Sequence, residues 1–191
     1  DALFYILKAT KKPRIPVLQR ISPRKKLILL TCHRRESFGK PILNIFKAVR
    51  RIALTRQDVE IIYPVHPNPN VKVPAYKILK KIKNVHLIPP VRYEVFCHLM
   101  KRAYLILTDY GGIQEEAPSL GKPVLVLRDV TERPEAIESG IARIVGTNKK
   151  RILHETLRLL NDEHLYSKMS HTRNPFGHGR ISKKIMGILS S

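Results

Sequence analysis

The stretch AYLILTDYGGIQEEAPSLGKPVLVLRD, residues 103–129, decides the fold. It begins and ends with a short apolar run, and the residues between these runs, GIQEEAPSLG, are typical of a helix in period and capping chemistry. Nearly continuous apolar character is what a strand needs when both faces of its sheet are covered. The stretch therefore predicts two parallel strands joined by a helical crossover.

The same alternation continues on both sides of this unit. Further strand-like runs rich in aliphatic and β-branched residues stand at 27–31, 59–65, 84–90 and 142–147. Segments of helical character separate the runs, at 39–55, 76–83, 93–103 and 134–140, and further helical segments follow from residue 149. The chain is predicted to form an α/β fold, a Rossmann-like doubly wound sheet of six parallel strands with a C-terminal helical tail.

Residues 1–26 have a different composition. A short helix-like stretch is followed by KKPRIPVLQRISPRKK, which contains three prolines. Such a segment is typical of a linker or an interdomain helix remnant. We therefore divide the chain into a linker at 1–26 and a Rossmann-like domain at 27–191. Because the first residue is Asp1 and not methionine, we expect the chain to be part of a longer protein.

The charge is strongly basic, with 36 Lys+Arg against 15 Asp+Glu and a net charge of +21. Such a balance is the electrostatic signature of a protein that binds nucleic acid or another polyanion. The basic residues recur along helical segments such as KAVRRIALTR and KILKKIKN, and there is no tryptophan for base stacking. This pattern favours solvated basic faces over a nucleic-acid surface. A non-catalytic basic module that binds polyanions stays as the alternative function.

Several other classes are excluded by missing features. No apolar run approaches the length of a membrane-spanning helix, and the first residues lack the basic region of a signal peptide. Cys32 and Cys97 lie far apart without metal-type spacing, which favours reduced thiols in a cytoplasmic protein. HETLR, residues 154–158, lacks the second histidine of a zinc-binding helix, so no metal site is predicted.

The loops that follow the predicted strands carry the candidate chemistry, because ligands bind beyond the carboxyl ends of parallel strands. Gly111 and Gly112 follow the strand that carries Asp109 and allow backbone N–H groups to approach an anion at the start of a helix. Glu116, with Glu115 beside it, offers oxygens suited to a ribose diol. Alternatively the glycines only form the turn and both glutamates cap the helix dipole, and the loop by itself favours that interpretation.

HRRE, residues 33–36, comes after the first strand. His33 can donate to an anion or exchange a proton, and Arg34 has the fork geometry that suits phosphate. The alternative is a basic loop in which Glu36 neutralises an arginine.

Two further loops carry candidates with equally open alternatives. His66 lies in a proline-framed loop, where it is either a ligand contact or a structural hydrogen-bond donor in a turn. Phe96, with Tyr93, begins the helix after the third strand and could form a platform for a base, although the spacing favours core packing.

Taken together, these loops are identified as those of a known family. HRRESFGKP (33–41), YPVHPNPNV (63–71) and TDYGGIQEEAPSLGKPVLVLRDVTERPEAI (108–137) occur here in one order and spacing, followed by VGT and NPFGHG. They closely resemble the C-terminal half of the non-hydrolysing UDP-N-acetylglucosamine 2-epimerases. The resemblance covers residues 1–191, and the block at 105–136 is its most specific part.

The resemblance implies one half of a glycosyltransferase-B-type fold, with the active site in the cleft between two Rossmann-like domains. The family, which serves bacterial cell-surface polysaccharide synthesis, interconverts UDP-GlcNAc and UDP-ManNAc by eliminating UDP and adding it back to the opposite face of the sugar. It uses no nicotinamide and no metal for this step, so no cofactor is expected. The resemblance also suggests homodimers, with no membrane and no nucleic-acid partner.

The resemblance also assigns roles to individual residues. Gly111 and Gly112 would cradle the pyrophosphate together with the residue before them, here Tyr110. Glu116 would hold the ribose hydroxyls, and Phe96 would lie near the uracil.

Three further positions take roles from the resemblance. His33 would be the catalytic group, beside the diphosphate, where it stabilises the departing UDP. Arg34 and His66 match positions that contact a second, regulatory UDP-GlcNAc in some bacterial members.

Three positions depart from the family pattern, and one half of the family's chain is missing. Tyr110 replaces a serine, Cys32 replaces a glycine, and His178 replaces an acid in the tail motif. The bulky phenol of Tyr110 either blocks the phosphate cradle or swings outward. The family's acid and base carboxylates lie in an N-terminal domain that has no counterpart here. We therefore expect a UDP-binding half-enzyme, inactive alone, whose N-terminal domain is supplied in the same chain or separately.

Overall fold

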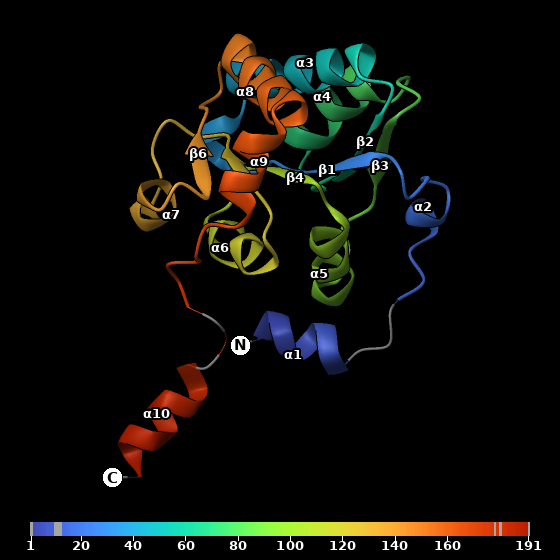
Figure 1. Cartoon of the computed structure of the whole chain (residues 1–191). Coiled ribbons are helices and arrows are strands. Elements are labelled where there is room, and N and C mark those ends of the chain that lie inside the picture. Colours follow the sequence, from blue (N-terminus) through green and yellow to red (C-terminus); the bar gives the residue numbers. More distant parts are fainter. Residues whose placement is uncertain (1, 10–12, 178, 180, 191) are drawn as a thin grey trace.

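Six parallel strands form one sheet at the centre of the computed structural model, which describes residues 2–9, 13–177, 179 and 181–190 (Figure 1). The strands are β1 Lys26–Thr31, β2 Val59–Pro64, β3 Val85–Ile88, β4 Leu105–Thr108, β5 Val124–Val126 and β6 Ala142–Ile144. Their order is β3-β2-β1-β4-β5-β6, and every neighbouring pair is parallel. The predicted fold class is confirmed.

Helices cover both faces of this sheet (Figure 1). The helices are α1 Ala2–Ala9, α2 Pro16–Gln19, α3 Lys40–Thr55, α4 Pro69–Leu79, α5 Tyr93–Arg102, α6 Gly111–Glu116, α7 Pro134–Glu138, α8 Lys149–Asn161, α9 Glu163–Ser170 and α10 Ile181–Leu189, with 3₁₀ turns η1 Arg35–Ser37 and η2 Ala117–Leu120. α3, α4 and α8 lie above the sheet in Figure 1, and α1, α5 and α6 lie below it. Because both faces are covered, every residue of the inner strands β4 and β5 is buried, whereas the edge strands β3 and β6 contain the half-buried His86 and Arg143.

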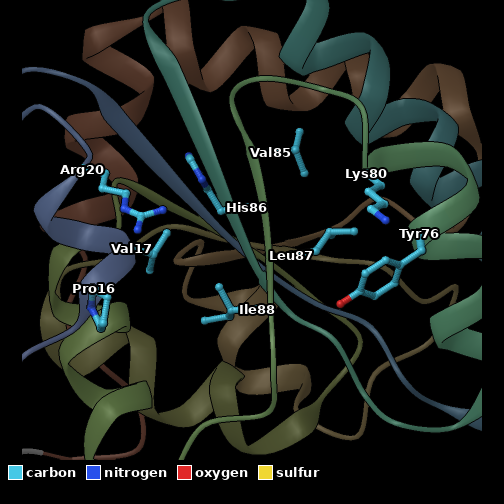
Figure 2. A pocket seen from close by; sticks show the side chains of 9 residues that line it. All are labelled: Pro16, Val17, Arg20, Tyr76, Lys80, Val85, His86, Leu87 and Ile88. Carbon is cyan, nitrogen blue, oxygen red and sulfur yellow. The ribbon is translucent and has the colours of Figure 1, made fainter.

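The strand β3 forms one edge of the sheet and is open on its outer side. Figure 2 shows its side chains alternating: Val85 and Leu87 point towards α4, and His86 and Ile88 point towards α2. A groove of about 450 Å³ lies along this edge between the two helices, and we call it the edge groove.

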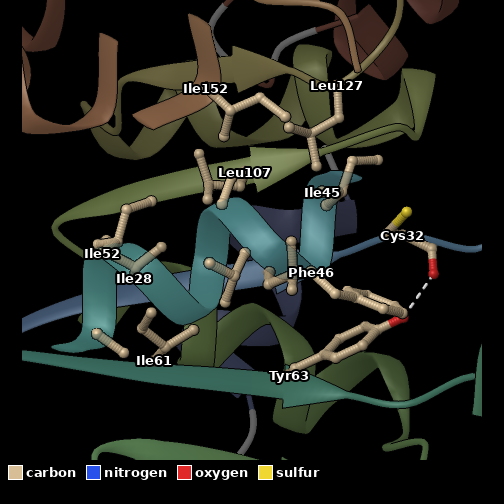
Figure 3. Packing of buried hydrophobic residues seen from close by; sticks show 14 of the residues in the cluster. Ile28, Cys32, Ile45, Phe46, Ile52, Ile61, Tyr63, Leu107, Leu127 and Ile152 are labelled. Atoms are coloured by element: carbon tan, nitrogen blue, oxygen red, sulfur yellow. Dashed lines mark hydrogen bonds between the residues drawn. The ribbon is translucent and has the colours of Figure 1, made fainter. Parts of the chain in front are cut away.

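One apolar layer packs between α3 and the sheet (Figure 3). α3 begins after Gly39, whose φ of 79° suits glycine, and its buried positions recur with helical period. Phe46 of α3 lies against Tyr63 of β2, with ring centroids 5.7 Å apart. The hydroxyl of Tyr63 donates a hydrogen bond of 2.7 Å to the backbone carbonyl of Cys32. This layer therefore fixes the chain just after β1, where the polar loop begins.

The predicted boundaries of one helix are wrong. α4 begins at Pro69 and ends at Leu79, whereas the sequence pattern predicted 76–83. The side chain of Asn68 accepts a hydrogen bond from the N–H of Asn70, and Pro69 stands in the first turn, where its missing N–H costs nothing. Pro74 is accommodated inside the helix, although a proline there normally argues for a break.

The segment predicted as a linker packs on the sheet. Leu3 of α1 is buried, as are Ile15 and Ile21, in the same apolar cluster as Leu29 and Ile106. The division of the chain at residue 26 stays a prediction. At the other end, α10 projects away from the sheet (Figure 1) and exposes Met186 and Leu189. Across the described residues, no helix is both long enough and apolar enough to span a bilayer.

Candidate functional site

The polar loops converge where the strand order reverses, between β1 and β4. Thr31 and Thr108 are paired at the ends of these strands, and their hydroxyl oxygens lie 2.7 Å apart. A cavity of about 340 Å³ opens beyond them. Six of the predicted site residues line it: His33, His66, Phe96, Tyr110, Gly112 and Glu116. We selected these loops by the rule that ligands bind at the carboxyl ends of parallel strands, and in the structure they surround one cavity.

Asp109 is fully buried directly after β4 and holds the loop that follows β1. Its Oδ2 accepts hydrogen bonds from the backbone N–H groups of His33 (2.7 Å) and Arg34 (2.8 Å). Its Oδ1 lies 3.8 Å from Nδ1 of His33 and makes no hydrogen bond within the described ranges. One oxygen therefore fixes the loop, and the other is available to the imidazole when that ring carries a proton.

The imidazole of His33 lies between two other rings. Its centroid is 5.3 Å from that of His66, with the planes 9° apart, and 5.7 Å from that of Tyr110. Burial lowers the pKa of His33, the carboxylate of Asp109 raises it, and His66 and Arg34 lower it. Because burial is the largest of these effects, His33 favours its neutral form more than a free histidine does. An anion bound beside it would favour the protonated, donating form.

Tyr110 lies at the mouth of the cavity. A β-carbon on Gly112 would be 2.9 Å from Cε1 of Tyr110, so the ring packs directly over this glycine. The guanidinium carbon of Arg34 lies 5.8 Å from the ring centroid. Tyr110 is also the N-cap residue of α6, but its side chain forms no capping hydrogen bond. The ring therefore occupies space beside the first amides of α6 and leaves those amides uncapped.

Glu116, at the end of α6, faces Tyr93 and Phe96 of α5. The hydroxyl of Tyr93 donates a hydrogen bond of 2.6 Å to Oε1 of Glu116. Burial raises the pKa of Glu116, the bond from Tyr93 lowers it, and Glu115 raises it. A carboxylate beside an aromatic ring can bind a sugar diol and stack the attached base.

Arg34 and Gly111 are not among the residues that line the cavity. Nη2 of Arg34 lies 3.5 Å from Oε2 of Glu132. Arg128, nearly buried, pairs with the same glutamate at 3.2 Å and also with Glu36. Glu36 thus neutralises an arginine, as the alternative interpretation of that loop proposed, but the arginine comes from the loop after β5.

His66 combines a cavity position with a turn contact. It is exposed, stacks on His33 and lines the cavity. Its Nδ1 accepts a hydrogen bond of 3.2 Å from the backbone N–H of Asn68, so in the turn it is an acceptor and not the predicted donor. The roles proposed for His66 and for the other site residues stay predictions.

Cys32 and His178 are the two other departures from the family pattern. Cys32 is buried in the apolar layer, and burial raises the pKa of its thiol, so this side chain fits the core without entering the cavity. His178 lies outside the described residues. Within the described ranges, no group of three or more histidine, cysteine or acidic side chains is placed to hold a metal ion.

Sequence reasoning missed three contributors. Asp109 was seen only as the end of a strand, Tyr93 only as an apolar platform, and Glu132 was not considered. The position of Asp109, between a buried strand and a glycine pair, was the usable signal, because a carboxylate there must find donors from a neighbouring loop. The Tyr93–Glu116 bond joins two helices and has no local signature.

Comparison with known proteins gives a consistent result. The family model for UDP-N-acetylglucosamine 2-epimerase matches residues 1–190. The UDP-N-acetylglucosamine 2-epimerase of Campylobacter jejuni is 49% identical over 99% of this chain and 52% of its own length. That of Escherichia coli K12 is 56% identical over 90% and 46%. The chain thus spans about half the length of the curated relatives it matches.

Solved structures agree. The Neisseria meningitidis UDP-GlcNAc 2-epimerase bound to UDP-GlcNAc superimposes with a TM-score of 0.90 at 41% identity, over 99% of this chain and 52% of that one. The Methanocaldococcus jannaschii UDP-GlcNAc 2-epimerase in complex with UDP-GlcNAc and UDP gives 0.79 at 36%, over 99% and 52%. A sucrose-phosphate synthase, at 11% identity and a TM-score of 0.67, shares the fold alone.

Proposed function

This chain belongs to the UDP-N-acetylglucosamine 2-epimerase family, and we propose that it is the UDP-binding half of such an enzyme. One observation carries the proposal: His33 in the loop after β1, Phe96 on α5, and Gly112 and Glu116 at the two ends of α6 all line one cavity at the carboxyl ends of β1 and β4. The spacing of these groups along the chain does not require that convergence. A nucleoside diphosphate needs each of the chemistries that they provide.

Each group has a physical role in this proposal. The ring of Phe96 stacks near the uracil, and Glu116 accepts hydrogen bonds from the ribose hydroxyls. The amide of Gly112 and the imidazole of His33 donate to the diphosphate. As UDP departs from the sugar, negative charge builds on that diphosphate, and donors already in position stabilise it.

The activity of the whole protein is also a proposal. Elimination of UDP from UDP-GlcNAc and its re-addition to the opposite face require acid and base groups that this chain does not provide by motif. We assign them to a second domain that closes over the sugar and excludes water. Homodimers and a cytoplasmic location extend the proposal, and the second is supported by the free, buried thiols of Cys32 and Cys97.

Ligand stabilisation tests binding directly. We expect UDP to raise the melting temperature of the chain, with a stabilisation of about 2.7 kcal/mol at 100 times its dissociation constant. Inorganic sulfate at the same ionic strength is the control for a general anion effect. The absence of any shift at millimolar UDP would contradict the proposal. Salt-sensitive binding of a polyanion such as heparin, without UDP competition, would favour the basic-module alternative.

Complementation tests the missing half. The chain is co-expressed with the part of the Campylobacter jejuni relative that it does not cover, and conversion of UDP-GlcNAc to UDP-ManNAc is measured. We expect activity only when both parts are present. The same part combined with a His33→Ala chain is the matched control, and it should lose most of the activity.

A further inference from the structure

We propose that Tyr110 sets how strongly this site discriminates between ligands with and without phosphate. Its ring fills the place that a diphosphate must enter, so a phosphate-bearing ligand has to displace the ring and a bare nucleoside does not. The inference rests on the proposed function, because it takes the uridine diphosphate site as given.

The first support is the place of the ring. Three ring atoms of Tyr110 lie within 3.6 Å of where a β-carbon of Gly112 would be, the nearest at 2.9 Å. The ring therefore lies against Gly112 on the side where any other residue would carry its β-carbon. An anion that approached the first turn of α6 from that side would meet the ring.

The second support is the surroundings of the ring. The imidazole of His33 lies 5.7 Å from the ring centroid, and the guanidinium carbon of Arg34 lies 5.8 Å from it. Both groups can carry a positive charge, and both would then attract an entering phosphate. The electron-rich face of the Tyr110 ring attracts the Arg34 guanidinium, as a bound anion would.

The third support is that the side chain can leave without moving the loop. The backbone N–H of Tyr110 donates to Oγ1 of Thr108 at 3.0 Å, and Asp109 beside it is anchored by two further backbone bonds. The residue Tyr110 is 45% exposed, and its hydroxyl makes no hydrogen bond within the described ranges. Rotation of the side chain into solvent therefore opens the place at the cost of ring contacts alone.

The other end of the cavity is independent of this movement. Phe96 and Glu116 lie on α5 and at the far end of α6, where the base and ribose are proposed to bind. Uridine needs only that end. Tyr110 should therefore weaken the binding of UDP and leave the binding of uridine unchanged.

The test compares Tyr110→Ala, Tyr110→Phe and the parent chain by isothermal titration calorimetry with UDP and with uridine. Losing contacts of this size should tighten UDP binding to Tyr110→Ala by roughly three- to tenfold. Tyr110→Phe keeps the ring and should match the parent. Uridine should bind all three equally. Equal UDP affinity in all three, or equal gains for UDP and uridine, would overturn the inference while leaving the UDP site in place.

A second readout reports on the ring directly. The chain contains seven tyrosines, and fluorine-labelled tyrosine with Tyr110→Phe as the reference identifies the resonance of Tyr110. We expect UDP to shift this resonance and uridine to leave it in place. A resonance unmoved by saturating UDP would overturn the inference. If UDP binds none of the three proteins, the proposed function fails and this inference fails with it.

Discussion

Two hollows in the described part of the molecule differ in what lines them. The edge groove has a volume of about 450 Å³, and the cavity beyond β1 and β4 has about 340 Å³. The larger one is lined by a single strand and two helices, with Arg20 and Lys80 at its margins. The smaller one is built around a fully buried carboxylate, stacked imidazoles and a tyrosine–glutamate hydrogen bond.

The difference teaches that the place of a hollow in the sheet topology, and not its volume, decides which polar groups come together there. At the switch between β1 and β4, loops from neighbouring parallel strands leave the sheet at the same edge and their polar groups meet. At the edge groove, the alternating side chains of β3 point away from one another, towards α2 or towards α4. Matched substitutions in the two hollows test this difference.

The largest expected effect is on stability. Asp109→Ala removes the acceptor of two backbone N–H groups, and we expect a loss of about 2–4 kcal/mol in the free energy of unfolding. Arg20→Ala at the edge groove should change it by less than about 0.5 kcal/mol. Urea denaturation of both variants gives the comparison. Equal losses would mean that the buried carboxylate holds nothing in place.

The next effect is on ligand affinity. Glu116→Ala should weaken UDP binding by about 10- to 100-fold, since hydrogen bonds to a charged group are lost. Lys80→Ala, which changes the charge of the edge groove, should leave the affinity unchanged in the same titration. If Lys80→Ala weakens UDP binding as much as Glu116→Ala does, the proposed position of UDP in the cavity beyond β1 and β4 is wrong.

A smaller effect concerns the N-cap of α6. Tyr110→Ser places a hydroxyl where it can accept a hydrogen bond from the first turn of that helix, which the tyrosine does not do. We expect about 1 kcal/mol of added stability in urea denaturation. Tyr110→Ala lacks the hydroxyl and is the control. A stability no higher for serine than for alanine would show that this helix needs no cap.

The smallest effect is a pH dependence. Burial lowers the pKa of His33, so the folded state disfavours its protonation. The stability that His33 contributes is complete above its unfolded pKa of about 6.5 and is lost as the pH falls towards the lower folded value. Between about pH 8 and pH 5, the parent should therefore lose more stability than His33→Gln does. Identical pH profiles for the parent and His33→Gln would contradict the role of His33 in this pH dependence.

Much of this arrangement could be predicted from the sequence, because buried parallel strands must be apolar and their loops must be polar. The runs at 27–31 and 59–65 match β1 and β2 closely, and six of the eight residues proposed as a site line one cavity. The start of α4 was missed, because Pro74 looks like a helix end when only local rules are applied.

The details that escaped prediction depend on side-chain direction. The rotation that lays Tyr110 over Gly112, and the reach of Tyr93 to Glu116, are decided by packing between elements distant in sequence. Local pattern contains no information on such rotamers. The sequence therefore predicted most of the candidate residues that line the cavity but not their contacts with one another.

The position of β1 also constrains how the chain folds. β1 pairs on one side with β2, the next strand along the chain, and on the other with β4, which is made only after β2, β3 and their helices. Closing that long loop costs more conformational entropy than forming the first pair, and contacts distant in sequence form slowly. During synthesis the first three strands can assemble before the loops that line the cavity come together. A ligand bound in that cavity would therefore stabilise only the sheet in which β1 and β4 are already paired, and it would not assist the earlier steps.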